Sequence, residues 1–430
     1  MIAPLRIGIV GCGTTGPAAA LLLREQGHDI TVFDAAPTCL PVGAGFLLQP
    51  SGMSVLDRLG LLDEVLRHAA KISGLAAFTR KGKTVLDLHY GAACERSHGA
   101  GLHRSVLLSA FLEAMSEAGI RVKWGQRVEQ VSEDQRYLIT NSGDSLGPFD
   151  LLLLADGSQS ATRSSLGLRQ RSTRYPWGAL WWVGQDHDGV FDDSLLYQIV
   201  DSTDHLTGFL PTGLKWQASQ HSAPCVSLFW SLRLDQRTTW LNTPIEKWKE
   251  QVIRQCPRAE TFIRPIQSHE EMSLASYHDV VMNRYHTARC AILGDAAHAM
   301  SPQLGQGVNL GLLDAACLAD ALAERDTLME ALELYSRKRK ASLSYYQFAT
   351  RWLTPVFQSD HRWIAPLRDI AFPIMTRFGL ARRQMIETMM GIKSDAIRND
   401  SALSQWMKDR FSEVSGKAGE SPLPKNLTRN

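Results

Sequence analysis

Residues 5–16 read LRIGIVGCGTTG, and this stretch decides the fold. The apolar run at 5–10 is typical of a buried parallel strand. A helix rich in alanine and leucine is predicted over residues 14–26, and Gly27 supplies its end. A second strand is predicted over 29–34. The stretch therefore predicts a strand–helix–strand unit at the start of an α/β domain.

Three glycines occupy the turn between the first strand and the helix. Gly11, Gly13 and Gly16 form a GxGxxG pattern, which permits a tight turn and a close approach of the backbone to a pyrophosphate. Phosphate oxygens are stabilised at a helix N-terminus by free N–H groups and the helix dipole. Asp34 ends the second strand, where an acidic side chain binds ribose hydroxyls and disfavours a 2′-phosphate. The pattern predicts a bound dinucleotide but does not distinguish FAD from NAD.

Two further turns follow buried strands downstream. Asp156-Gly157 comes after an apolar run at 150–155, and Ser160 is placed to cap a following helix. Gly294-Asp295 follows the apolar run at 290–293, and a glycine-rich stretch at 301–309 opens a long helix. An aspartate at a strand end accepts hydrogen bonds from a sugar-alcohol chain. The helix start would stabilise negative charge on a reduced flavin ring.

In this order, the three motifs resemble those of the single-component (group A) FAD-dependent aromatic hydroxylases. That family includes para-hydroxybenzoate, salicylate and ubiquinone-pathway hydroxylases, and the resemblance extends over most of residues 1–350. It implies FAD as cofactor, NADH or NADPH as co-substrate, and O2. The implied reaction is hydroxylation of a small aromatic or heteroaromatic substrate through a flavin C4a-hydroperoxide.

The resemblance also implies which residues bind FAD. Arg104 would reach the phosphates, Val128 would contact the adenine through its backbone, and Asp34 stands where the family often has glutamate. The implied cofactor-binding residues are Gly11, Gly13, Thr15, Gly16, Asp34, Gly43, Ala44, Gly45, Arg104, Val128, Asp156, Gly157, Gly294, Asp295, Pro302, Gly305, Gly307, Val308 and Asn309.

Catalytic residues cannot be assigned from the sequence. His205 and His221 fall in the expected substrate domain, but a histidine at the surface or with a satisfied side chain is the commoner case. Five aromatic residues are candidates for the wall of the substrate pocket, although each of them is more typical of the hydrophobic core. They are Trp181, Trp182, Tyr197, Phe209 and Phe229.

The predicted fold is α/β: a Rossmann-like FAD-binding domain of the GR2 type, with an inserted, mostly antiparallel β-sheet substrate domain and C-terminal helices. The FAD-binding domain is expected to comprise residues 1–174 and 277–355, and strands from 70–100 are expected near the substrate domain. The substrate domain is expected over 175–276. C-terminal helices are expected over 356–411 and a flexible tail over 412–430. Helical structure is expected over 51–70 and 352–391, and long helices are expected over 304–351.

Composition excludes several classes. The chain has 430 residues, a formal net charge of +2 and seven scattered cysteines without a CxxC pair, so a disulfide framework, a structural metal site and a nucleic-acid partner are not expected. The basic run at 337–340 is interpreted as a solvated helix face. No leader and no membrane-spanning segment are recognised, so a cytoplasmic location is expected. The expected oligomeric state is a monomer or homodimer.

Other activities on the same fold stay open. A flavin oxidase, a Baeyer–Villiger or epoxidising enzyme and a halogenase share the expected cofactor site. The halogenase is the weaker alternative, because residues 177–182 (WGALWW) do not match a Trp-x-Trp-x-Ile-Pro segment. A non-enzymatic escort protein on a degenerate flavoprotein fold would be expected to lack flavin contacts, whereas all three motifs are intact.

Overall fold

The α/β part of the chain is built on a five-stranded parallel sheet. The computed structural model describes residues 2–38, 44–218 and 222–412. The sheet has the order β18-β12-β1-β2-β8. Its strands are β1 (Arg6–Val10), β2 (Asp29–Phe33), β8 (Arg121–Lys123), β12 (Leu151–Leu154) and β18 (Cys290–Ile292). Because all five run parallel, the turns that follow β1, β12 and β18 leave the same edge of the sheet.

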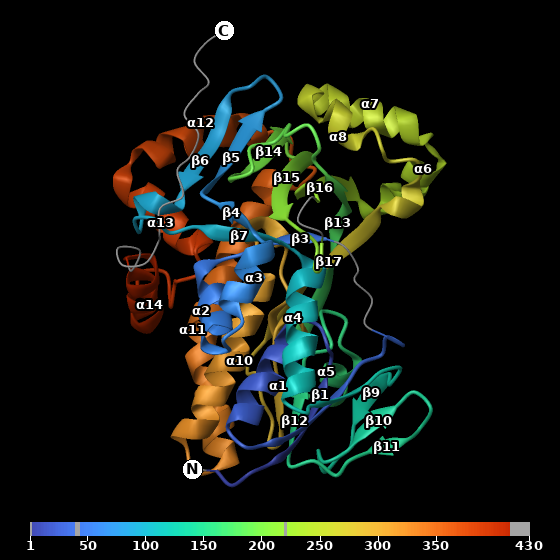
Figure 1. Cartoon of the computed structure of the whole chain (residues 1–430), viewed down its shortest axis with the longest axis vertical. Helices are drawn as coiled ribbons and strands as arrows, with labels where there is room; N and C mark the ends of the chain where they lie inside the picture. Colours follow the sequence, from blue (N-terminus) through green and yellow to red (C-terminus); the bar gives the residue numbers. More distant parts are fainter. Residues whose placement is uncertain (1, 39–43, 219–221, 413–430) are drawn as a thin grey trace.

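Helices and a small meander pack around this sheet. In Figure 1, α1 and α10 lie to the left of β1, strands β9 to β11 lie to its right, and α4 packs beside α1. The helices are α1 (Thr15–Glu25), α2 (Pro50–Arg58), α3 (Leu62–His68), α4 (Arg104–Glu117), α5 (Ala161–Ser165), α9 (Asp295–His298), α10 (Gly307–Glu324) and α11 (Leu328–Phe357). The meander strands are β9 (Val128–Val131), β10 (Leu138–Thr140) and β11 (Ser145–Leu146).

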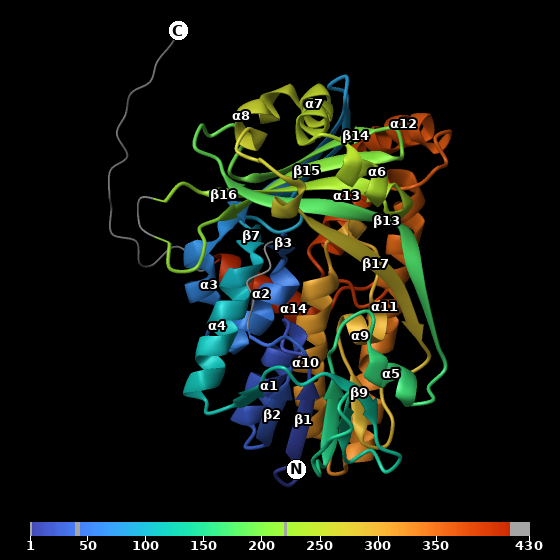
Figure 2. The same ribbon diagram turned by 90° about the vertical axis from the view of Figure 1, so that its right-hand side faces the viewer.

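A seven-stranded, mostly antiparallel sheet lies across one end of the α/β part (Figure 2). Its order is β17-β13-β16-β15-β14-β5-β6, and only the β14–β5 pair is parallel. The strands are β5 (Gly74–Thr79), β6 (Thr84–His89), β13 (Gln170–Gln185), β14 (Leu195–Asp201), β15 (His205–Gly213), β16 (Cys225–Arg233) and β17 (Ser273–Met282). A three-stranded sheet, β3 (Gly45–Leu48), β7 (Gly99–His103) and β4 (Ala70–Ile72), lies beneath it.

The two faces of the seven-stranded sheet bury different sets of side chains. One face packs against α6 (Arg237–Asn242), α7 (Ile245–Gln255) and α8 (Glu260–Ile263), forming a separate core with Trp248 and Phe209. The opposite face looks towards the α/β part. C-terminal helices complete the molecule: α12 (Ile364–Arg377), α13 (Gly379–Met389) and α14 (Ser401–Ser412). The predicted fold class is confirmed; the domain limits proposed from the sequence remain a prediction.

Two sequence predictions require correction. The helix predicted over 51–70 is two helices, α2 and α3, because Gly60 between them adopts a positive φ of 69°. The long helices expected over 304–351 are α10 and α11. The basic run is not wholly solvated, because Arg339 is buried whereas Arg337, Lys338 and Lys340 are exposed. Within the described residues, no helix is both long and apolar enough to cross a membrane.

Candidate active site

The three turns predicted from the sequence meet at one edge of the parallel sheet. Gly11 has a φ of +105°, and a Cβ atom there would lie 2.3 Å from the carbonyl oxygen of Ala155, directly before the second turn. A Cβ atom on Gly294, in the third turn, would lie 2.6 Å from Oγ1 of Thr15 at the start of α1. The first turn therefore touches both of the others, and side chains at these glycines would push the turns apart.

The first turn presents an open approach to the N-terminus of α1. A Cβ atom on Gly13 would meet no atom within 4 Å, whereas one on Gly16 would lie 2.0 Å from the carbonyl oxygen of Gly11. Asp34 accepts hydrogen bonds from the backbone N–H of Cys12 (2.7 Å) and of Ala36 (2.8 Å), which fixes its carboxylate beside the turn. The first turn of α1 contains no acidic residue that would compete with a bound phosphate.

The second turn contains a buried carboxylate oxygen that lacks a partner. Thr162 donates its hydroxyl to Oδ2 of Asp156 (2.9 Å), but Oδ1 has no hydrogen-bond partner among the described residues. Burial raises the pKa of this carboxyl group. A Cβ atom on Gly157 would point into open space. Ser160 caps α5 as predicted, accepting from the backbone N–H of Arg163 at 2.9 Å.

Arg163 joins the second turn to the third. It is buried, and Nη1 donates to the carbonyl oxygen of Ala296 in α9 (2.7 Å) and to that of Ser158 (3.3 Å). Burial lowers the pKa of its guanidinium, and the nearby charge of Asp156 opposes that change. The sequence contained this arginine within the second motif but gave no sign that it connects two motifs.

A buried ion-pair network holds the third turn from behind. Asp314 on α10 is fully buried and accepts from the backbone N–H of Gly294 (2.8 Å), from Nε2 of His298 (2.5 Å) and from Nε of Arg339 (2.6 Å). Burial tends to raise the pKa of Asp314, but His298 and Arg339 outweigh that effect and lower it. The network fixes the path of the turn that places Asp295, whose own side chain is exposed.

The start of α10 completes the edge. Gly305 has a left-handed conformation (φ +62°), and its Cβ direction is open. Neither the N-cap residue Gln306 nor an acidic side chain caps the first turn of α10. Asn309 instead holds the neighbouring strand, donating to the carbonyl oxygen of Leu47 (3.2 Å) and accepting from the N–H of Gln49 (2.8 Å). The amide of Asn309 is therefore engaged by the protein.

A cavity of about 600 Å³ opens beside the third turn and extends under the seven-stranded sheet. Eight predicted cofactor residues line it: Ala44, Gly45, Arg104, Asp295, Pro302, Gly305, Gly307 and Val308. The others are distributed over the neighbouring elements: Gly11, Gly13, Asp156 and Gly157 in the first two turns, Gly294 in the third, Thr15 and Gly16 in α1, Asp34 directly after β2, Val128 on β9 and Asn309 in α10. Gly43 lies outside the described residues.

The candidate wall residues divide between the two faces of the sheet. Trp181 and Phe229 line the cavity, with ring centroids 5.4 Å apart. Trp182, Tyr197 and Phe209 belong to the core on the opposite face. The division follows from strand geometry, because successive side chains point to opposite faces. Had the expected strands been assigned a buried and a cavity face, this alternation would have separated Trp181 from Trp182.

Of the two histidines considered as a base, the one that the structure describes, His205, does not line the cavity. His205 is exposed at the start of β15 and forms an ion pair with Asp204 (3.1 Å), and His221 lies outside the described residues. Tyr277, on β17, was not anticipated. It lines the cavity, its hydroxyl accepts a hydrogen bond from Nε1 of Trp181 (3.2 Å), and burial raises its pKa to about 12. Only the pairing of β17 with β13 brings it there, and this pairing has no local sequence signal.

The residues at the three turns fit an FAD molecule. Open Cβ directions at Gly13, Gly157 and Gly305 leave room for a ligand against the backbone, and Asp156, in the second turn at this edge, has a buried Oδ1 without a partner among the described residues. Two helix N-termini, of α1 and α10, carry no acidic side chain in their first turns. This set of donors suits a pyrophosphate at one end and an electron-rich ring at the other.

Comparison with known proteins agrees with this geometry. The family model described as an FAD binding domain matches residues 5–344. The chain belongs to this FAD-binding domain family. One relative, 3-amino-4-hydroxybenzoate 2-monooxygenase of Streptomyces cremeus, is 29% identical over 352 residues, covering 78% of this chain and 83% of the relative. Another, 2-heptyl-3-hydroxy-4(1H)-quinolone synthase of Pseudomonas aeruginosa, is 24% identical over 377 residues, covering 84% and 92%.

Solved structures share the fold of this family member. HpxO of Klebsiella pneumoniae, in complex with FAD and uric acid, has a TM-score of 0.75 at 20% identity, covering 90% of this chain and 97% of that one. The family and its relatives confirm the prediction of an FAD-dependent monooxygenase related to the group A aromatic hydroxylases. The individual FAD contacts remain predictions.

Proposed function

We propose that this enzyme uses NADH or NADPH and O2 to hydroxylate an uncharged aromatic or heteroaromatic compound that carries an apolar substituent. The observation behind the proposal is the chemistry of the cavity wall. Among the described residues that line it, Arg104 and Asp295 are the only charged ones. Arg104 is expected to reach the FAD phosphates and Asp295 stands at the third turn, so both belong to the cofactor side.

The rest of the wall suits an apolar compound. Leucine side chains from four strands cover the sheet side, at positions 75, 86, 88, 196, 206 and 210. A substrate carboxylate buried here would lose its hydration without gaining a cationic partner, which is costly. The quinolone synthase relative has a heptyl group in its name, and a substituent of that kind matches this wall.

Two side chains are placed to orient the substrate. Tyr277 stays protonated at neutral pH because its pKa is about 12, so its hydroxyl can donate to a substrate oxygen while accepting from Trp181. Phe229 and Trp181 offer aromatic faces for a ring. The apolar wall excludes water from the reacting ring. FAD, when bound, supplies hydride acceptance from NAD(P)H and the activation of O2.

The test is a substrate screen on the purified holoenzyme. Aromatic compounds with and without alkyl substituents, and with and without a carboxylate, are added while NAD(P)H oxidation and O2 uptake are recorded. The expected result is stimulation by uncharged, alkyl-substituted rings, with one atom of isotopically labelled O2 found in the product. Stimulation confined to carboxylated rings would contradict the proposal.

The same screen separates the alternative activities. Oxygen uptake that yields only hydrogen peroxide and an oxidised product without label would indicate an oxidase. Label inserted between a carbonyl carbon and its neighbour would indicate Baeyer–Villiger chemistry, and turnover that requires halide would indicate a halogenase. Failure to reconstitute the protein with FAD would indicate a non-enzymatic escort protein.

A further inference from the structure

Helix α12 is apolar on two sides. Its inner side contributes Phe372 and Met375 to the cavity wall. Its outer side carries large apolar side chains at intervals of four, three and four residues, which form one stripe on a helix. This outer stripe, continued through the turn into α13, consists of Trp363, Leu367, Ile370, Ile374, Phe378 and Leu380, each between 47% and 76% exposed.

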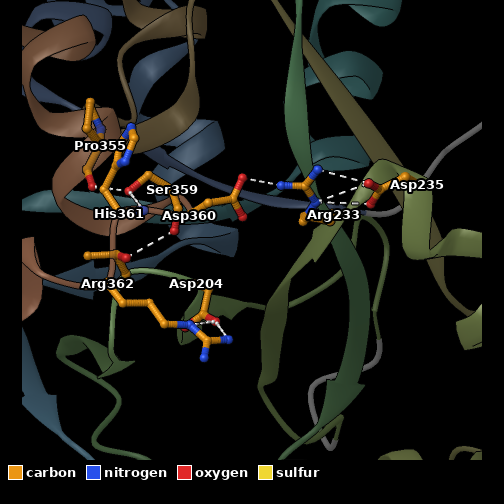
Figure 3. Close-up of polar contacts among 9 residues, drawn as sticks. Asp204, Arg233, Asp235, Pro355, Ser359, Asp360, His361 and Arg362 are labelled. Carbon is orange, nitrogen blue, oxygen red and sulfur yellow. Dashed lines mark hydrogen bonds and ion pairs between the residues drawn. The ribbon is translucent and has the colours of Figure 1, made fainter.

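Polar contacts fix α12 so that this stripe faces outward. The corner between α11 and α12 is tied to the seven-stranded sheet from two directions (Figure 3). Arg233 of β16 pairs with Asp360, and Arg362 donates to Asp204 at 2.7 Å. Arg368, on the inner side of α12, donates to the carbonyl oxygen of Ser202 at 2.6 Å. The exposure of the stripe therefore results from a helix that is held in place.

The exposed charged side chains of the two helices themselves have one sign. The exposed charged side chains of α12 and α13 are Arg377, Arg382 and Arg383. Arg377 follows Ile374 by three residues and so continues the same face. The acidic residues of these helices are not free at the surface: Asp369 is paired with Arg368, and the buried Glu387 is paired with Lys393 and Arg383.

A second basic group lies on the element next to α12. Strand β6 packs against α12, and the hairpin that joins β5 to β6 carries Arg80, Lys81 and Lys83, all exposed. Arg80 pairs with Asp201, whereas Lys81 and Lys83 form no ion pair with the described residues. The apolar face is thus bordered by cations on more than one element.

We propose that the outer stripe docks on an anionic lipid surface. Contiguous apolar surface of this kind is uncommon on a monomeric protein and marks an interaction site. An apolar helix face bordered by arginines is the pattern of a helix that lies in the membrane interface, with the cations near anionic headgroups. A two-fold pairing with a second copy would instead offer these arginines no exposed acidic side chain from α12 or α13 as a partner.

The cavity reaches the surface close to this face. Phe348 and Trp352 on α11 line the cavity and are themselves exposed, and α12 packs against α11. A compound dissolved in the bilayer would therefore have an apolar path from lipid to the cavity. Docking itself does not depend on the proposed reaction, and it is measured without substrate.

The test is co-sedimentation of the full-length holoenzyme with vesicles of phosphatidylcholine, with and without phosphatidylglycerol. The expected result is strong binding to the anionic vesicles, weaker binding to the neutral ones, and loss of binding at high salt. Replacing Ile370→Ser together with Ile374→Ser should lower the partition coefficient at least about tenfold. Arg377→Glu with Arg382→Glu should lower it by a similar factor on anionic vesicles only.

Matched controls carry the same changes elsewhere. Leu241→Ser with Met329→Ser removes two exposed apolar side chains outside α12, and Arg237→Glu with Lys247→Glu reverses two exposed charges on α6 and α7. Both controls should bind as the parent does, and all variants should keep their FAD content and melting temperature. The proposal is overturned by an absence of vesicle binding or by equal loss in stripe and control variants. A parent dimer that the serine variant dissociates would overturn it in favour of a second copy.

Discussion

Replacing Asp314 by asparagine should destabilise the enzyme and weaken its hold on FAD. The side chain is fully buried and joins Gly294, His298 and Arg339 through contacts of 2.8, 2.5 and 2.6 Å. Asparagine keeps the shape but removes the charge, so the buried guanidinium of Arg339 loses its counter-charge. Breaking a buried pair in this way costs about 3–5 kcal/mol of unfolding free energy. The third turn should then shift and FAD should dissociate more readily.

The matched control lies on the same helix. Asp320 pairs with Arg58 at 2.7 Å, but both side chains are exposed, so Asp320→Asn should cost less than about 1 kcal/mol. Denaturant unfolding of both variants, with and without added FAD, measures the stability difference, and flavin fluorescence measures the dissociation constant. If Asp314→Asn lost no more stability than Asp320→Asn, the role assigned to the buried network would be refuted.

The pH dependence of this difference has a definite sign. The folded-state pKa of Asp314 is lowered, so its contribution to stability is complete above the unfolded value of about 3.9 and is lost as the pH falls through the folded value. The stability gap between the parent and Asp314→Asn should therefore be constant near neutral pH and should narrow in acid. A gap that widened in acid would contradict the assigned charge state.

Three further predictions concern the cofactor turn and the cavity. Gly11→Ala should lower the unfolding free energy of even the apoprotein by about 2 kcal/mol or more, because Gly11 has a φ of +105° and the new Cβ atom would lie 2.3 Å from the carbonyl oxygen of Ala155. Gly13→Ala should change apoprotein stability by less than about 1 kcal/mol but raise the FAD dissociation constant. Equal losses of stability in the two variants would contradict this distinction. Tyr277→Phe should raise KM or lower kcat for substrates with a ring oxygen while costing no more than about 1.5 kcal/mol of stability, and unchanged kinetics would remove it from the site. Ala179→Leu, in the cavity wall, should raise KM for bulky substrates more than for small ones at constant FAD content, as steady-state kinetics would show.

The meeting of the three turns could be predicted because it depends on local patterns. Apolar runs that precede Gly11, Asp156 and Gly294 indicate parallel strands, and the carboxyl ends of parallel strands share an edge. The support behind the third turn could not be predicted in the same way. Asp314 and Arg339 are separated by 25 residues on two helices, and each reads in the sequence as an ordinary surface charge.

The residues that line the substrate cavity are determined by strand pairing, so they were harder to predict from the sequence. Five aromatic residues were candidates for the wall, but only Trp181 and Phe229 face the cavity. Tyr277 reaches it through the pairing of β17 with β13, which skips several residues between Arg174 and Gly178. Such a register shift changes the face of the sheet on which a side chain lies, and no sequence pattern on either strand predicts it.

A crystal structure of the holoenzyme would test the central claim most directly. The account predicts the FAD pyrophosphate at the N-terminus of α1, beside Gly13, and the isoalloxazine ring against residues 302–308 with one face open to the cavity under the seven-stranded sheet. A flavin ring placed away from that cavity, or a pyrophosphate away from the first turn, would contradict it.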